Sequence, residues 1–257
     1  MSALAARGLT GLSEVVPGDD LAELIVEAGR GALRDGQVVA IAHKVVSKSE
    51  GALVALSEVL AGSRARELAA GPLAPTDGSE RDPRVVQVVL DQSAEIVRAA
   101  NGVLICRTHH GYVCANAGVD ASNSPNPDTL IVLPSDPDAS ARALRARIRE
   151  LTGACTAVLI TDSFGRAWRH GQCDVALGCA GMAPLDDWRG RADSTGHELR
   201  ATWLAVADAA AAAADLARAK DSREPVVVID GLERFVTAED GPGAAALIRP
   251  LDEDLFR

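Results

Sequence analysis

Two stretches of the sequence concentrate side chains that can bind ligands or metal ions. Residues 107–123 (RTHHGYVCANAGVDASN) hold two histidines, two asparagines and an aspartate, and residues 160–171 (ITDSFGRAWRHG) place Asp-Ser before three basic or histidine side chains. Each stretch follows an apolar run typical of a buried strand. Because irregular segments lie at the protein surface and often carry function, we predict that both are loops and form facing walls of one active site.

The oxygen donors of these stretches are typical of a site for a hard divalent cation. Asp120 and Asp162 each come just after a predicted strand, and the Ser163 hydroxyl and the Asn123 amide lie close to them in sequence. Mg²⁺ and Mn²⁺ prefer such an all-oxygen set, which phosphate oxygens and water complete. Turn capping is the alternative role for either aspartate.

Basic side chains accompany these carboxylates. Lys44 and Lys48 lie four residues apart at the end of a predicted strand, residues 37–46, and Arg166 and Arg169 follow Asp162 closely. Fixed cations around metal-binding carboxylates are what phosphoryl transfer requires, because negative charge develops on the phosphate oxygens. The alternative for the two lysines is weak surface ion pairing with nearby glutamates, Glu50 or Glu58.

The remaining candidates carry less specific signals. His109 and His110 have no third histidine at ligand spacing, so we predict substrate contact or a structural role rather than metal binding. Trp168 and Trp188 suit either stacking on a flat ring or core packing. Neither G-x-G-x-x-G after the first strand nor G-x-x-x-x-G-K-[ST] is present, so a bound nucleotide would use other phosphate contacts.

Composition and charge restrict the class of protein. The 257 residues carry a net charge of −10, which argues against a general nucleic-acid or anionic-membrane surface. No apolar run reaches the length of a membrane span, and the N-terminus lacks a signal-peptide pattern, so we expect a cytoplasmic protein. The five cysteines form no Cys-x-x-Cys pair and are expected to be reduced thiols.

Helical and strand patterns are mixed along the chain, with long irregular loops between them. The patterns predict helices at 20–32, 57–70, 83–100, 138–151 and 197–220 (the longest), and strands at 37–46, 102–107, 129–134, 154–161, 175–177 and 225–230. Aspartates at 19–20, 82 and 136 are expected to cap helices. The arginines of 138–151 are expected to form a solvated face, with phosphate binding as the alternative. This arrangement predicts a mixed α/β fold, not a Rossmann or P-loop fold.

Several of these stretches are long enough to be specific motifs. The sequence resembles the coenzyme F420:L-glutamate ligases (gamma-glutamyl ligases), and in particular the N-terminal ligase domain of the actinobacterial two-domain form. The matching stretches, in the family's order, are residues 11–21, 43–51, 81–90, 106–123, 160–181 and 184–208. The resemblance therefore covers nearly the whole chain.

The resemblance implies an unusual two-lobed mixed α/β ligase fold that forms homodimers. The implied reaction is GTP-dependent: the carboxylate of the deazaflavin precursor of coenzyme F420 is phosphorylated, the α-amine of L-glutamate attacks the acyl phosphate, and further glutamates can follow through γ-linkages. Two divalent cations, Mg²⁺ or Mn²⁺, are implied, and the resemblance leaves open whether K⁺ assists. GTP, L-glutamate and the precursor are thus the expected partners, with no nucleic acid and no membrane.

The family's functional positions can be transferred to matching residues of this chain. The resemblance implies nucleotide contacts at Leu12, Ser13, Glu14, Val15, His43, Lys48, Asn123 and Lys220, and metal contacts at Asp120, Asp162 and Ser163. Together with the charge argument above, Asp120, Asp162, Lys48 and Arg166 become the expected catalytic residues. The chain departs from the family at Ser13, where Pro is common, and at His43, where Ser or Thr is frequent; Lys220 cannot ligate a cation while protonated.

The expected ligase domain spans residues 1–250, and residues 251–257 would be a tail or the start of a linker to a flavin domain. Two other functions stay open from the sequence. A metal-dependent phosphohydrolase could use the same carboxylates on a nucleotide, and a non-catalytic lobe could bind nucleotide or deazaflavin for a partner.

Overall fold

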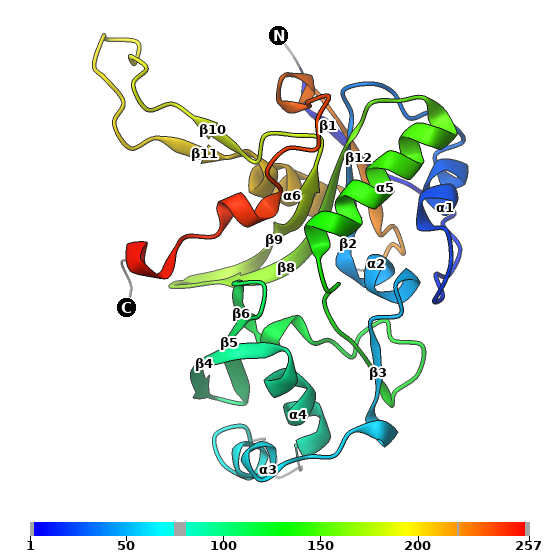
Figure 1. Cartoon of the computed structure of the whole chain (residues 1–257), viewed down its shortest axis with the longest axis vertical. Helices are drawn as coiled ribbons and strands as arrows, with labels where there is room; N and C mark the ends of the chain where they lie inside the picture. Colours follow the sequence, from blue (N-terminus) through cyan, green and yellow to red (C-terminus); the bar gives the residue numbers. More distant parts are fainter. Residues whose placement is uncertain (1–2, 75–80, 220, 255–257) are drawn as a thin grey trace.

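A mixed five-stranded sheet forms the centre of the protein in a computed structural model that describes residues 3–74, 81–219 and 221–254 (Figure 1). In spatial order its strands are β1 (Ala5–Gly8), β12 (Val226–Asp230), β2 (Val38–Ala42), β8 (Ala157–Arg166) and β9 (Arg169–Ala180). Only β2 and β8 pair in parallel, and the other neighbours are antiparallel. This mixed topology confirms the expected mixed α/β class and differs from the parallel Rossmann sheet.

Helices cover both faces of this sheet. Helices α1 (Leu21–Ala28) and α5 (Pro137–Thr152) pack on one face, and α6 (Val206–Ala217) packs on the other. Successive residues of β2 alternate between the two cores, as a strand buried on both sides requires. The alanines of α6 allow its close approach to the sheet.

A second lobe lies below this sheet in Figure 1. It contains a three-stranded sheet and two helices around its own apolar cluster, and a short two-stranded ladder connects it to the main sheet. Its elements are α3 (Ser63–Ala70), α4 (Pro83–Asp91), β4 (Ser93–Ala100), β5 (Val103–Thr108) and β6 (Val113–Ala115), with β3 (Leu53–Ala55) and β7 (Thr129–Ile131) in the ladder.

The remaining elements are short. They are α2 (His43–Ser49), the ribbon of β10 (Leu185–Asp187) and β11 (Trp203–Ala205), and 3₁₀ turns at Leu56–Glu58, Asn116–Gly118, Glu233–Phe235, Ala244–Leu247 and Leu251–Glu253. None of the helices in the described ranges is both long and apolar enough to cross a membrane.

Helix starts follow the predicted caps. The carboxylates of Asp20, Asp82 and Asp136 accept hydrogen bonds from backbone N–H groups in the first turns of α1, α4 and α5. Helix α5 ends at Gly153 in the left-handed conformation, with φ of 75°. Helix α1 ends at Ala28, four residues before the predicted end at 32.

Predictions that depended on periodicity alone were wrong at three helices and one strand. The predicted helix 57–70 begins only at Ser63. The predicted helix 83–100 ends at Asp91, because residues 93–100 pair with β5 as strand β4. The predicted helix 197–220 begins only at Val206, because residues 203–205 pair with β10, and α5 is therefore longer than α6. Strand β2 stops at Ala42, where α2 begins.

Two predicted surface features were also wrong. Residues 160–171 are not an irregular loop, because β8 continues to Arg166 and forms a hairpin with β9, which also contains the predicted strand 175–177. The arginines of α5 do not share one solvated face. Arg145 is buried, and its guanidinium donates to Asp240 and to backbone carbonyls including Thr156 O.

Candidate active site

A cleft of about 1110 Å³ lies between the main sheet and the segments around it. Its walls come from residues 12–17, from the start of α2, from residues 123–125, from residues 161–163 of β8 and from residues 218–219, 221 and 223–225. Segments distant in sequence therefore meet here, and both chemically active stretches of the sequence reach the cleft. The volume exceeds the usual range for one small ligand, about 300–1,000 Å³.

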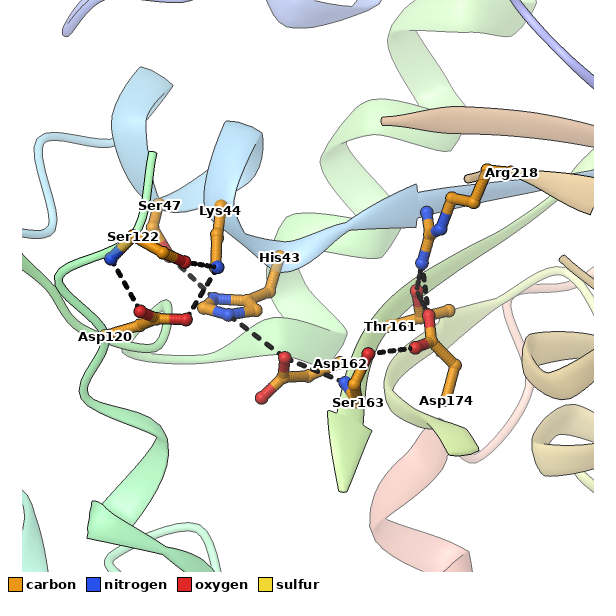
Figure 2. Close-up of polar contacts among 10 residues, drawn as sticks. All are labelled: His43, Lys44, Ser47, Asp120, Ser122, Thr161, Asp162, Ser163, Asp174 and Arg218. Atoms are coloured by element: carbon orange, nitrogen blue, oxygen red, sulfur yellow. Dashed lines mark hydrogen bonds and ion pairs between the residues drawn. The ribbon is translucent and has the colours of Figure 1, made fainter. Parts of the chain in front are cut away.

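The junction of β2 and α2 supplies the basic side chains. Lys44 and Lys48 lie one helical turn apart, so they share a side of α2 although the predicted strand there was wrong. Lys44 Nζ is 2.6 Å from Asp120 Oδ2 and 2.6 Å from Ser122 Oγ (Figure 2). Lys48 is 7% exposed at its side chain, and its Nζ is 2.6 Å from Oε1 of Glu14. The predicted alternative pairing with Glu50 or Glu58 was wrong.

His43 begins α2 and is almost completely buried, with 2% exposure of its side chain. Its Nε2 lies 3.4 Å from Asp162 Oδ1, and its Nδ1 lies 3.4 Å from Ser47 Oγ. Nε2 has no hydrogen-bond partner among the described residues, so the 3.4 Å contact with Asp162 is not a hydrogen bond. Figure 2 shows the imidazole of His43 directed at the carboxylate of Asp162.

Asp162 presents a carboxylate oxygen to the cleft from β8. Its Oδ1 accepts a hydrogen bond of 2.8 Å from Ser163 N–H, whereas no hydrogen bond to Oδ2 occurs within the described part of the chain. This carboxylate oxygen and the neighbouring Ser163 hydroxyl are oxygen ligands of the kind that a hard cation binds.

Asp120 does not itself line the cleft, but it pairs with Lys44, which does. Its backbone pairs with Ile131, and its Oδ1 accepts from Ser122 N–H at 2.7 Å. Burial opposes ionisation of Asp120, but the Lys44 ammonium and the Ser122 N–H group outweigh it and hold the pKa of this carboxyl below its ordinary value. Asn123 follows in the left-handed region, with φ of 56°, and lines the cleft.

A buried polar cluster at the end of β8 was not predicted from the sequence. Asp174, fully buried, accepts from Thr161 Oγ1 at 2.8 Å and from Ser163 Oγ at 2.6 Å, and it pairs with Arg218 Nη2 (Figure 2). Arg218 also donates to Thr161 Oγ1 at 2.9 Å. Asp174 and Arg218 both line the cleft. The only signal of this cluster in the sequence was Asp174, a single acidic residue just before the apolar residues of the predicted strand 175–177.

The N-terminal wall is formed by Leu12, Ser13, Glu14 and Val15. The backbone N–H groups of these four residues donate no hydrogen bond to any residue that the structure describes. Ser13 and Glu14 are exposed, Leu12 is half-buried and Val15 is buried, and N–H groups without a partner among the described residues at a cleft are donors to a ligand. This geometry suits the nucleotide contacts that the sequence resemblance implies.

Other predicted residues lie elsewhere. Arg166 and Arg169 do not line the cleft but lie at the hairpin of β8 and β9, where Arg166 Nη2 donates to His170 O at 2.5 Å. Lys220 is outside the described residues. His109 and His110 contact backbone carbonyls, with His110 Nε2 2.9 Å from Pro134 O, in agreement with a structural role.

The structure also shows where the predicted tryptophans and the cysteines lie. Trp168 is exposed at the hairpin and Trp188 contacts Asp186 and Arg191, and neither lines the cleft. All five cysteines are free thiols, as predicted. Burial raises the pKa of the Cys114 and Cys179 thiols to about 12.

The assembled residues form a polar cleft in which Asp162, Lys44 and Lys48 face a wall of backbone N–H groups that donate to no described residue, and Asp120 pairs with Lys44 beside the cleft. No group of three or more His, Cys, Asp or Glu side chains in the described ranges is placed to hold a metal ion. The expected set of Asp120, Asp162 and Ser163 has only two carboxylates, which is compatible with Mg²⁺, since this ion commonly takes one or two carboxylates plus phosphate oxygens and water.

Comparisons with known proteins agree with the motifs. The family model described as F420-0:Gamma-glutamyl ligase matches residues 11–231. A coenzyme F420:L-glutamate ligase of Methanopyrus kandleri is 46% identical over 246 residues, covering 95% of this chain and 94% of the relative. Proteins of the same name from Methanothermobacter thermautotrophicus and Halobacterium salinarum are 39% and 43% identical, with 97% and 95% of their lengths covered. The chain belongs to the F420-0:gamma-glutamyl ligase family.

Proposed function

We propose that this protein is a GTP-dependent ligase that joins L-glutamate to the deazaflavin precursor of coenzyme F420, first through an amide and then through γ-glutamyl bonds. The observation that carries the proposal is the convergence of Asp162, Lys44 and Lys48 on one cleft, with Asp120 paired to Lys44 beside it, in a chain of this family. The names of these relatives support the two organic substrates.

The nucleotide is proposed to bind along the N-terminal wall. The unpaired N–H groups of residues 12–15 supply donors, and Lys48 supplies a nearly buried positive charge. Glu14 is 78% exposed, so it can leave Lys48 at low cost when a phosphate arrives. Lys48→Ala should therefore weaken GTP binding more than glutamate binding, measured by isothermal titration with each ligand.

Divalent cations are proposed to bind at Asp162, Asp120 and Ser163. Asp162 Oδ2 is free of partners in the described ranges, and the donor set is entirely oxygen, which fits Mg²⁺ or Mn²⁺. When bound, such a cation neutralises charge on the phosphate oxygens. Asp120 is already paired with Lys44, so it would share its carboxylate between the lysine and the ion. Participation of K⁺ stays a prediction.

The residues of the cleft are proposed to orient two successive displacements. In the first, a carboxylate oxygen of the precursor attacks the γ-phosphorus of GTP, the bond to the bridging oxygen breaks, and GDP leaves. In the second, the α-amine of glutamate attacks the acyl carbon, loses a proton, and expels inorganic phosphate. Lys44 and Lys48 stabilise the charge on the transferred phosphoryl group. Arg166 lies at the hairpin, so a direct catalytic role would require it to move.

Assembly and location are proposals on the same basis. We propose a cytoplasmic homodimer, and the β10–β11 ribbon, which projects from the main body and exposes Trp203 and Leu204, is a suitable contact surface (Figure 1). Light scattering after size exclusion tests this. A linker to a flavin domain after residue 250 stays a prediction.

The test of function is GDP release from GTP in four mixtures: alone, with glutamate, with the precursor, and with both. The ligase predicts release that requires both co-substrates and a deazaflavin product that gains glutamate units. Release that ignores the co-substrates would support a phosphohydrolase instead. Nucleotide binding without release, unchanged by Asp162→Asn, would support a non-catalytic binding lobe.

A further inference from the structure

Strand β9 carries one more residue than its partner at the border between the core and the cleft. Ile160 of β8 pairs with Gly178, but the next residue, Thr161, pairs with Ala176, which leaves Leu177 without a partner in the ladder. This is a β-bulge, a feature found preferentially next to active sites, where it redirects side chains.

The bulge determines which side chains meet in the cleft. Beyond it, Ser163 lies opposite Asp174, and the two form a hydrogen bond of 2.6 Å. If the register on the core side continued without the extra residue, Asp174 would lie opposite Phe164 instead. Because neighbouring residues of a strand point to opposite faces, the hydrogen bond between Ser163 and Asp174 depends on the bulged register.

Two side chains from other elements satisfy the backbone groups at the bulge. Asp208 of α6 accepts from Ala176 N–H at 2.9 Å, and the hydroxyl of Tyr112, between β5 and β6, donates to the carbonyl of Leu177. Strand β9 is at the edge of the sheet, so no further strand is available to these groups. Ala176 and Leu177 are buried, and a buried backbone group without a partner costs about 1–3 kcal/mol.

We propose that Asp208 and Tyr112 are positioning residues of the active site. They fix the bulge of β9 and, through it, the orientation of Ser163 and Asp174. Neither side chain lines the cleft, and each acts through the backbone of β9. The catalytic part of this inference rests on the proposed function, whereas the structural part does not.

The test compares Asp208→Ala and Tyr112→Phe with a matched control, Asp35→Ala. The Asp35 carboxylate also accepts one backbone N–H, from Cys155 at 2.7 Å, but Asp35 precedes β2, Cys155 precedes β8, and neither lines the cleft. Hydrogen exchange of the amides of β9 is measured in each variant, together with kcat and the KM for GTP.

The inference predicts faster exchange at residues 172–177 in both variants, unchanged exchange at residues 157–160, and neither effect in Asp35→Ala. It also predicts that kcat falls about 10- to 100-fold, which is the range for removing a hydrogen-bond partner that orients a metal-binding residue. The KM for GTP should change less. Asp208→Asn keeps an acceptor oxygen and should recover most of kcat. Burial already raises the pKa of Asp208, so a neutral side chain is compatible with this position.

Unchanged exchange at residues 172–177 in both variants would overturn the inference. So would equal losses of kcat in Asp35→Ala, since the effect would then be general destabilisation. Changed exchange with unchanged kcat would overturn the positioning role. If the wild-type protein releases no GDP under any condition, the proposed function fails, and the exchange data still decide whether these residues hold the bulge.

Discussion

Removing Arg218 should cost more stability than removing any exposed arginine, because it leaves the carboxylate of Asp174 buried without its ion pair. The Asp174 side chain is 0% exposed and that of Arg218 is 10% exposed. Breaking a buried pair on one side costs about 3–5 kcal/mol. The Thr161 and Ser163 hydroxyls still donate to Asp174, so we expect the lower end, about 3 kcal/mol.

The assay is urea and thermal unfolding of Arg218→Ala beside a matched control, Arg142→Ala. Arg142 Nη2 lies 4.0 Å from Asp136 Oδ2 and is 40% exposed at its side chain, so its loss should cost about 0–1 kcal/mol. For a chain of this size, a loss of about 3 kcal/mol lowers Tm by about 6–12 °C. The double variant Arg218→Ala/Asp174→Asn should be more stable than Arg218→Ala alone, because it removes the unpaired charge.

The reasoning is refuted if Arg218→Ala loses no more stability than Arg142→Ala. It is also refuted if neutralising Asp174 in the Arg218→Ala background gives no recovery. Either result would mean that water or a rearranged side chain compensates the carboxylate.

Three further predictions concern the site and the core. Asp162→Asn should abolish GDP release while the free energy of unfolding changes by less than about 1 kcal/mol; unfolding of the variant would instead indicate a capping role. Cys114 and Cys179, whose thiol pKa is raised to about 12, should resist alkylation at pH 8 in the native protein and react after denaturation; rapid native labelling would contradict their burial. Because the pKa of Asp120 is lowered, its ion pair with Lys44 stabilises the fold above about pH 4 and is lost as pH falls through the lower folded-state pKa. The stability difference between wild type and Lys44→Met should therefore shrink in acid, from about 1 kcal/mol near neutral pH, and a difference that grows in acid would contradict the pairing.

Local signals in the sequence were sufficient for part of the fold. The helix starts at Asp20, Asp82 and Asp136 depend on a side chain and the next few N–H groups, and all three were predicted. Residues 93–100 were predicted as helix because their strand conformation depends on pairing with β5, which a local pattern does not reveal. The same applies to residues 203–205, which pair with β10.

In the candidate site, too, local sequence signals were sufficient for some residues and not for those that meet through tertiary contacts. Asp120 and Asp162 were predicted because each follows an apolar run within a motif; Asp162 in fact lies inside β8, and the two carboxylates contact Lys44 and His43, which are neighbours at the start of α2. Asp174 and Arg218 are 44 residues apart and meet only through the register of β9 and the end of α6. Arg166 follows Asp162 by four residues, but in a strand this separation carries it along the hairpin and away from the cleft.

The central claim is that a carboxylate of the precursor is activated by phosphorylation before glutamate attacks. The most direct measurement uses precursor labelled with oxygen-18 in that carboxylate, with unlabelled GTP and glutamate, and determines the isotope in the released inorganic phosphate by mass. An acyl phosphate predicts one labelled oxygen in each phosphate formed by ligation, since the acyl C–O bond breaks when the amine attacks. Unlabelled phosphate accompanied by glutamate incorporation would contradict the account.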